Sequence, residues 1–566
     1  MDSRSRAREQ LVEGSVAAGI ILLALKLPAE AWPQIQNDTI LMSDHPQIEA
    51  TDLNRNVASG PLLGPRAIVA AIAGLKFLLH MLTAAKYGLF TDELYFLACG
   101  EHLAWGYVDM PPLTAVQAWF ARTLLGDSPY AIHFLPALAG AALVLMTGAM
   151  VRQLGGGRWA QAIAALAAAL APGCLAFDAY LSMNSIDLML VAGLAMILIR
   201  IVQTGDARLW LGFGAVAGIG LLNKHTIILF GFGFVVSLLF TRARGLMFNR
   251  WFIAGGAVAF LFFLPNLAWM WRHNFPHLEQ LANIRRNQRN VSLSPIAFFG
   301  QQILLAGPAL LPLWLAGLWR FIAGKGRELR ALGVAYVIAL VVLIAANSRV
   351  YYLMPAYPIL FAGGAIALEE WLARRWLAWV KPAYAVLIVI SGTMLAPMAM
   401  PLLAPETYLN YTAAIGFSPP RIENRVTSAL PQLFADRFGW PEMARAVADA
   451  YHSIPEPERE KTAIFAQDYG QAGAIDFYGR ELGLPKAISG HLTYWYWGPR
   501  DYTGEIMLVM GDRREVLERK FESVEKVGEA GHPYAMASQH WELFLCRGPK
   551  GWSNLQEVWP QLKNWN

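Results

Sequence analysis

Charged residues are scarce in this chain. Asp, Glu, Lys and Arg make up 15% of its 566 residues, whereas they make up about a quarter of a typical soluble domain. Hydrophobic residues make up 56%, and between residues 65 and 400 they gather into runs close to membrane-crossing length. This composition excludes an ordinary soluble protein and predicts a polytopic α-helical membrane protein.

Cysteine is also scarce. The three cysteines, Cys99, Cys174 and Cys546, form no CxxC pair, which argues against a zinc ribbon or a disulfide framework. The chain also lacks a P-loop and a GxGxxG motif after a soluble strand, so nucleotide binding is not indicated.

Eleven membrane spans are predicted from the apolar runs. They cover roughly residues 65–85, 129–151, 159–176, 184–202, 209–222, 226–240, 251–271, 296–319, 331–346, 351–371 and 382–400. Five of the connecting loops are rich in Arg and Lys, and the positive-inside rule places such loops in the cytoplasm. The loops on the opposite, external side are then 86–128, 177–183, 223–226, 272–295 and 347–350.

The two ends of the chain differ from its apolar middle. Residues 1–60 are predicted to be a weakly ordered cytoplasmic tail, with true initiation at Met42 as an alternative. Residues 61–404 form the predicted membrane domain, and residues 405–566 form a small extracytoplasmic α/β domain. Its expected strands are Thr462–Ala466, Ile506–Met510 and Trp541–Cys546, and its expected helices are Gln471–Glu481 and Arg513–Lys520.

The external loop 86–128 carries three carboxylates, Asp92, Glu93 and Asp109. An idle charge at the membrane surface is costly, so the cluster favours function. It suits a general base with a ligand for an ion or substrate, and the alternative is helix capping or pairing with external arginines. After Pro111-Pro112 the spacing of apolar residues predicts an amphipathic helix on the membrane surface.

Two further charged residues lie in apolar surroundings. Asp187 stands near the start of a predicted span, where solvation does not explain it. Lys224 lies at the tip of a hairpin of two short spans, and an anionic headgroup or an aspartate partner would account for it. The alternative for Lys224 is a side chain that snorkels to water.

External arginines and tyrosines complete the candidate substrate site. The planar guanidinium group is well suited to phosphate, although a solvated basic face or contact with anionic lipid would also explain arginines here. The tyrosines alone would be ordinary interface residues. The residues in this group are Arg272, Arg285, Arg286, Arg349, Tyr351 and Tyr352.

The motifs, taken in order, resemble the GT-C superfamily of membrane glycosyltransferases that use polyprenyl-phosphate sugars. The nearest resemblance is to bacterial protein O-mannosyltransferase relatives, aminoarabinose transferases of lipid A and rhizobial galacturonosyltransferases. It rests on the Asp-Glu pair within Thr91–Tyr95 and on the Gly-Tyr-x-Asp-x-Pro-Pro-Leu segment Gly106–Leu113, and it covers roughly residues 65–400.

This resemblance implies roles for individual residues. Asp92 is similar to the family's proposed general base, with Glu93 beside it. Asp109 stands where the aminoarabinose transferases have a metal-liganding Glu, which makes it a candidate ligand for a divalent metal ion, although Met110 replaces the lysine that follows there. Asp187 resembles a second acidic position, and Lys224 resembles a lysine that contacts lipid phosphate.

The sequence therefore predicts an inverting glycosyltransferase of a bacterial inner membrane. Its donor would be a sugar on a polyprenyl-phosphate carrier, and its acceptor a hydroxyl of a lipid, glycan or protein at the outer face. A lipid-linked sugar flippase or other transporter is the alternative, but its charged residues would line a path through the bilayer midplane. A membrane scaffold would leave the carboxylates unexplained.

Overall fold

The computed structural model describes residues 64–565 apart from 421–422 and 425–427, and from Pro65 onward the chain forms one compact unit. The predicted tail of residues 1–60 lies outside the described residues. The boundary predicted between residues 404 and 405 stays a prediction.

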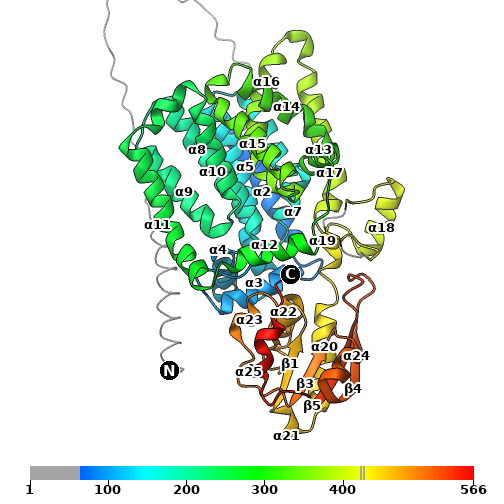
Figure 1. Ribbon diagram of the computed structural model, residues 1–566. Helices are drawn as coiled ribbons and strands as arrows, with labels where there is room; N and C mark the ends of the chain where they lie inside the picture. The colour runs from blue at the N-terminus through cyan, green and yellow to red at the C-terminus, as the bar shows by residue number, and fades with distance from the viewer. Residues whose placement is uncertain (1–63, 421–422, 425–427, 566) are drawn as a thin grey trace, which may run out of the picture. The chain divides into compact units, whose positions relative to one another are not determined.

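Most of the described helices before residue 400 are apolar and packed in a bundle (Figure 1). Seven helical stretches in the described part are long and apolar enough to cross a membrane. They are α2 (Pro65–Thr83), α5 (Pro129–Gln153), α8 (Met183–Thr204), α11 (Arg250–Arg272), α15 with η4 (Arg327–Ala345), α16 with η5 (Val350–Trp371) and α17 with η6 (Arg375–Ala399). Shorter apolar helices are α6 (Arg158–Leu170), α9 (Leu209–Asn223) and α10 (Ile227–Leu239). The helical fold is as predicted, and the count of eleven spans stays a prediction.

Two predicted spans are broken in the structure. The span expected over 296–319 is two helices, α13 (Pro295–Ala306) and α14 (Leu311–Ile322), which meet at 97° across the short turn η3 (Pro308–Leu310). Gly307 has φ +106°, a conformation that other residues rarely adopt, and Pro308 cannot donate a backbone hydrogen bond. The span expected over 159–176 likewise ends with α6, and α7 (Pro172–Phe177) follows after Ala171.

Glycines allow neighbouring membrane helices to approach each other closely. A Cβ atom on Gly214 of α9 would lie 1.9 Å from the carbonyl oxygen of Gly255 of α11. A Cβ atom on Gly317 of α14 would lie 2.0 Å from the carbonyl oxygen of Leu360 of α16. Such small-residue contacts are the usual basis of helix packing in lipid, because lipid offers no hydrophobic driving force between helices.

A buried ion pair links α2 to the residue that follows α7. Lys76 Nζ lies 2.7 Å from Asp178 Oδ2, and each side chain is 1% exposed. Lys76 also donates to the carbonyl oxygen of Ala168, at 3.2 Å. Removing one partner of such a pair would leave a buried charge without compensation, so Asp178 is a structural residue and not an ordinary loop residue.

The loop 86–128 is largely helical. It contains α3 (Thr91–Glu101), which sequence reasoning did not predict, and α4 (Leu113–Phe120), which continues as the π-helical turn η1 (Ala121–Leu125). The predicted amphipathic helix after Pro112 corresponds to α4 and η1. Leu124, on its outer side, is 62% exposed.

A five-stranded mixed sheet lies in the C-terminal region, in the order β2-β1-β3-β5-β4. β1 pairs in parallel with β2 and β3, and β5 is antiparallel to β3 and β4. The strands are β1 (Thr462–Ala466), β2 (Ile488–Ser489), β3 (Ile506–Met510), β4 (Phe521–Ala530) and β5 (Trp541–Pro549). The three predicted strands coincide with β1, β3 and β5, while β2 and β4 were not predicted.

The C-terminal region also contains short helices. They are α18 (Pro405–Ala414), α19 (Gln432–Ala435), α20 (Trp440–Ser453), α21 (Glu456–Arg459), α22 (Tyr469–Tyr478), α23 (Tyr494–Trp497), α24 (Arg514–Lys520) and α25 (Leu555–Val558). The remaining elements are η2 (Arg242–Met247), α12 (Pro276–Arg286) and η7 (Trp559–Leu562).

The two faces of the sheet belong to different hydrophobic clusters. Phe465 and Val509 pack with residues of α24 and α25. On the other face, Ile464 and Leu508 pack with α20 and α22 in a cluster that continues into α3 through Leu94. The loop 86–128 and the C-terminal sheet therefore share one core.

Candidate active site

Glu93 holds the first turn of α3 in place. Its Oε2 accepts the backbone N–H of Phe90, at 2.7 Å, and its Oε1 accepts the backbone N–H of Leu181, at 2.6 Å. His133 Nε2 lies 2.9 Å from the same Oε1. Burial alone would raise the pKa of Glu93, but His133 and these hydrogen bonds leave the pKa below its usual value. Both carboxylate oxygens of Glu93, a predicted catalytic residue, are thus engaged in structural hydrogen bonds.

Asp92 has different surroundings, because successive residues on a helix point about 100° apart. Its Oδ1 accepts the hydroxyl of Tyr469 at 2.7 Å, and its side chain is partly exposed. Burial raises the pKa of Asp92. The Tyr469 hydrogen bond and the charges of Arg289 and Arg349 oppose this rise, while Glu423 adds to it. Different charged residues therefore affect the pKa of each carboxylate: Arg289, Arg349 and Glu423 for Asp92, and His133 and Arg437 for Glu93.

Asp109 is the second carboxylate near Asp92. Its Oδ1 accepts the hydroxyl of Tyr95 at 2.8 Å. Burial raises the pKa of Asp109 to about 7; the Tyr95 hydrogen bond opposes this rise and the charge of Asp92 adds to it. The pKa of both neighbouring carboxylates is therefore raised, and perturbed pKa values of this kind are common at functional sites.

The candidate role of Asp109 as a ligand for a divalent metal ion stays a prediction. Within the ranges that the structure describes, no group of three or more His, Cys, Asp or Glu side chains is arranged to hold one. Tyr95 donates to one oxygen of Asp109, which leaves the other oxygen for a further contact.

The raised pKa of Asp109 predicts that stability falls as the pH rises. The folded protein retains a proton up to about pH 7 that an ordinary Asp releases near its usual value of 3.8, so stability is lost as the pH rises between these two values. We expect the unfolding midpoint of the purified protein to fall between about pH 4 and pH 7. Asp109→Asn should reduce this fall without abolishing it, because the pKa of Asp92 is raised as well.

Thermal unfolding in detergent at several pH values would check this prediction. Asp206→Asn is the matched control, because Asp206 is an exposed carboxylate in a connecting loop and its removal should leave the slope unchanged. An equal slope in wild type and Asp109→Asn would contradict the prediction.

Lys224 lies at the tip of the α9–α10 hairpin. It donates to Asn184 Oδ1 at 2.8 Å, and its Nζ lies 3.9 Å from Asp187 Oδ2. The same ammonium group lies 4.5 Å from the ring centre of Tyr352 and 5.5 Å from that of Tyr351, within range of cation–π attraction. The structure thus brings together four residues that the sequence singled out separately.

Arg349 connects this group to the surroundings of Asp92. Its Nη1 donates to the hydroxyl of Tyr351 at 3.2 Å, and its Nη2 pairs with Glu423. Arg289 Nε lies 3.1 Å from the same carboxylate. Two guanidinium groups therefore meet at one buried anion, close enough to Asp92 to affect its pKa.

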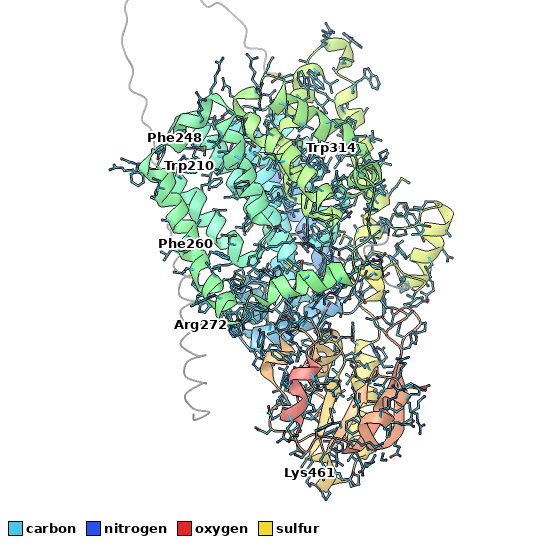
Figure 2. All side chains as sticks on the ribbon, viewed as in Figure 1. Trp210, Phe248, Phe260, Arg272, Trp314 and Lys461 are labelled. Carbon is cyan, nitrogen blue, oxygen red and sulfur yellow. The ribbon has the colours of Figure 1, made fainter. Side chains whose placement is uncertain are left out.

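The other predicted arginines do not join this cluster. Arg272, Arg285 and Arg286 are exposed, and Figure 2 shows Arg272 at the end of α11 that lies away from Trp210 and Phe248. Arg289 takes the inward position because the chain turns after α12, where Gln288 has φ +49°. Sequence patterns gave no signal that separates Arg289 from its neighbours.

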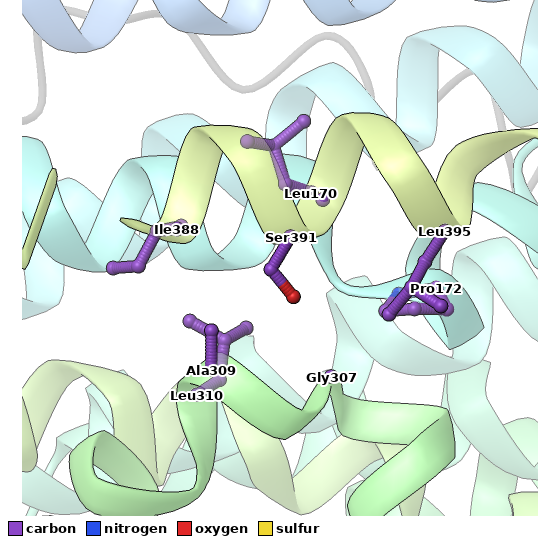
Figure 3. Close-up of a pocket in the computed structure, with 9 residues that line it drawn as sticks. Leu170, Pro172, Gly307, Ala309, Leu310, Ile388, Ser391 and Leu395 are labelled. Carbon is purple, nitrogen blue, oxygen red and sulfur yellow. The ribbon is translucent and has the colours of Figure 1, made fainter. Parts of the chain in front are cut away.

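A small apolar pocket lies between α17 and the bend at Gly307 (Figure 3). The predicted site residues are not among those that line it. Its lining residues are Leu170, Pro172, Gly307, Ala309, Leu310, Ile388, Ser391, Gly392 and Leu395.

Comparisons with known proteins agree with this architecture. The family model for dolichyl-phosphate-mannose-protein mannosyltransferase matches residues 109–269. No curated protein sequence matches the chain. Among solved structures, ArnT from Cupriavidus metallidurans in the apo state is 16% identical with a TM-score of 0.56, and covers 84% of this chain and 97% of its own. The same protein bound to undecaprenyl phosphate is 15% identical with a TM-score of 0.55, and has the same coverage.

Archaeal oligosaccharyltransferase AglB from Archaeoglobus fulgidus is a more distant structural match, at 12% identity and a TM-score of 0.45, covering 75% of this chain and 64% of its own. The family match and the ArnT-like fold together confirm the resemblance of this chain to the GT-C membrane glycosyltransferases.

Proposed function

We propose that this protein transfers a sugar from a polyprenyl-phosphate carrier to a hydroxyl group of a lipid, glycan or protein, with inversion at the anomeric carbon. The observation that carries the proposal is the position of Asp92, a partly exposed carboxylate that accepts the Tyr469 hydroxyl and whose pKa is lowered by the charges of Arg289 and Arg349. The ArnT-like fold supports it, since ArnT has been crystallised bound to undecaprenyl phosphate.

In the proposed reaction, Asp92 accepts the proton of the acceptor hydroxyl. The acceptor oxygen then attacks the anomeric carbon opposite the phosphate and forms the new glycosidic bond. The bond from that carbon to the phosphate oxygen breaks, and its electron pair leaves with the carrier phosphate. Asp92 is left protonated and returns its proton to water.

The departing phosphate gains negative charge, so cations that stabilise it lower the barrier. Arg349 and Arg289 offer guanidinium groups, which can form paired bonds to phosphate, and Lys224 offers an ammonium group beside Tyr351 and Tyr352. Asp187, which lies 3.9 Å from Lys224, keeps that cation in place. Glu423 already neutralises part of the arginine charge, so the incoming phosphate would share or displace its contacts.

The exposed arginines Arg272, Arg285 and Arg286 fit a separate role. Solvated guanidinium groups beside a membrane surface attract anionic headgroups, so we assign them to the approach of the carrier lipid. In this proposal the membrane is a bacterial inner membrane, and the loop 86–128 and residues 405–566 lie on its extracytoplasmic side.

The proposal is tested in a strain that lacks the gene and is complemented with wild type or Asp92→Asn. Intact mass spectrometry of envelope glycolipids and glycoproteins should show a species one sugar lighter in the mutant strain alone, which would identify both sugar and acceptor. Equal masses, with both proteins present in the membrane, would favour the transporter hypothesis.

A further inference from the structure

The C-terminal sheet region contacts Asp92 directly and reaches Asp109 through Tyr95. From these contacts we propose that Tyr469 is a positioning residue for Asp92 and that Thr493 positions Asp109 through Tyr95. The α/β region would then be part of the catalytic centre and not only a cover over it. This inference rests on the proposed function and adds a role for residues outside the membrane helices.

The first contact reaches Asp92 directly. The hydroxyl of Tyr469 donates to Asp92 Oδ1 at 2.7 Å. Two rings pack against that of Tyr469, with its centre 5.1 Å from that of Tyr95 and 4.9 Å from that of His491. The backbone N–H of Tyr469 also donates to His491 Nδ1, at 3.2 Å. These contacts restrict where its hydroxyl can point.

The second contact reaches Asp109 through one intermediate. Thr493 Oγ1 lies 2.6 Å from the hydroxyl of Tyr95, which donates to Asp109 Oδ1 at 2.8 Å. Thr493 Oγ1 also accepts the backbone N–H of Val108, at 3.1 Å. Thr493 thus fixes both the tyrosine that holds the carboxylate and the backbone just before it.

Close packing fixes the position of α22 relative to α3. α22, which begins at Tyr469, lies against α3 (Figure 1). A Cβ atom on Gly473 would lie 2.7 Å from backbone atoms of Leu94, and one on Gly470 would lie 2.3 Å from Thr91 Oγ1. Only glycine at these two positions allows such an approach, so the distance from Tyr469 to Asp92 is set by backbone contact.

Ion pairs fix the other end of α3. Glu101, its last residue, accepts Lys486 Nζ at 2.5 Å and Arg122 Nη1 at 2.6 Å. Arg122 in turn lies 2.6 Å from Asp127, which also pairs with Arg480. The C-terminal region therefore contacts both ends of α3, the helix that carries Asp92. The shared hydrophobic core lies between these two contacts.

The Tyr469 hydroxyl has a defined effect on a general base. A donor to a carboxylate favours its charged form and so lowers its pKa, and Tyr469 opposes the rise that burial causes in the pKa of Asp92. The hydrogen bond also engages one carboxylate oxygen. The other oxygen is then left to face the acceptor hydroxyl.

Kinetics of Tyr469→Phe test the inference. We expect kcat to fall roughly tenfold, which corresponds to one hydrogen bond to a charged group, while KM for the polyprenyl-phosphate sugar stays within about twofold of wild type. The acidic limb of the kcat profile should move to higher pH, because Asp92 without its donor needs a higher pH to lose its proton. A purely structural tyrosine would not move that limb.

Matched variants distinguish loss of the Tyr469 positioning role from a general loss of structure. Tyr451→Phe removes a tyrosine hydroxyl whose contact, to the carbonyl oxygen of Arg459, lies within the C-terminal region, and it should keep the wild-type rate and pH profile. Gly473→Ala should lower kcat with both tyrosines intact, because α22 must move away from α3. If Tyr469→Phe does not fold, Thr493→Val offers the same test at Asp109.

Wild-type kcat and an unmoved acidic limb in folded Tyr469→Phe would overturn the inference while leaving the proposed function intact. Absence of transfer by the wild-type protein, with identified donor and acceptor supplied, would overturn both.

Discussion

Asp92→Asn is expected to lose roughly a thousandfold in kcat, within the range for removal of a general base. Asparagine has nearly the same shape as aspartate and its oxygen can still accept the Tyr469 hydroxyl that Asp92 accepts at 2.7 Å. The fold should therefore survive, and only the capacity to take a proton from the acceptor is lost. The measurement is transfer of sugar by purified protein under saturating donor and acceptor.

Glu93→Gln is the informative comparison, because Glu93 is adjacent in sequence but bonded to His133 and to two backbone N–H groups. We expect its main effect on the unfolding midpoint, since the charged acceptor of a buried network is weakened. A folded Asp92→Asn enzyme with full activity would remove Asp92 from the mechanism. A larger loss of kcat in Glu93→Gln than in Asp92→Asn would show that Glu93, and not Asp92, is the general base.

Arg349→Ala is expected to lower kcat/KM for the donor roughly a hundredfold or more, the scale for loss of one preorganised group that stabilises developing negative charge. Its guanidinium group lies between Tyr351 and Glu423, where it can reach the proposed phosphate position. The fold should persist because Arg289 still pairs with Glu423, at 3.1 Å.

Two arginine variants serve as controls. Arg285→Ala removes an exposed guanidinium at the end of α12, and its effect should be small and lost at high salt, because exposed charges are screened. Arg349→Lys should recover only part of the activity, because an ammonium group lacks the paired geometry of the guanidinium. If Arg349→Ala has the same kcat and the same KM for the donor as wild type, Arg349 does not bind the donor phosphate.

The sequence was informative wherever a residue conflicted with its local surroundings. Asp92, Asp109, Asp187 and Lys224 could be chosen because a charge in an apolar context is costly, and the structure gathers them around α3 and the α9–α10 hairpin. The predicted membrane helices lie near their expected positions for the same reason, since long apolar runs have few other solutions.

Residues in ordinary surroundings could not be found in this way. Tyr469 lies in a soluble-looking segment 377 residues from Asp92, and nothing local marks its hydroxyl as special. In the sequence, Glu423 and Arg289 are two of many charged residues in polar loops. Only the fold shows that they form an ion pair. The Asp-Glu pair shows the opposite difficulty, because two adjacent carboxylates appear equivalent in sequence but point about 100° apart on a helix.

The bend at Gly307 was missed for a related reason. Apolar residues continue through 295–322, so hydrophobicity alone favours one straight span. The Gly307-Pro308 pair was the available signal, since glycine permits the positive φ and proline breaks the helical hydrogen bonds.

The contact between α3 and α22 also orders events during biosynthesis. A ribosome adds roughly 5 to 20 residues per second, so the 377 residues between Asp92 and Tyr469 take on the order of 20 to 75 seconds to make. A nascent chain already inserted through its first helices would hold Asp92 without its partner for that whole interval. A product truncated before Tyr469 would keep Asp92 without this hydrogen bond permanently, and in the proposed reaction we expect it to transfer sugar more slowly than the complete chain.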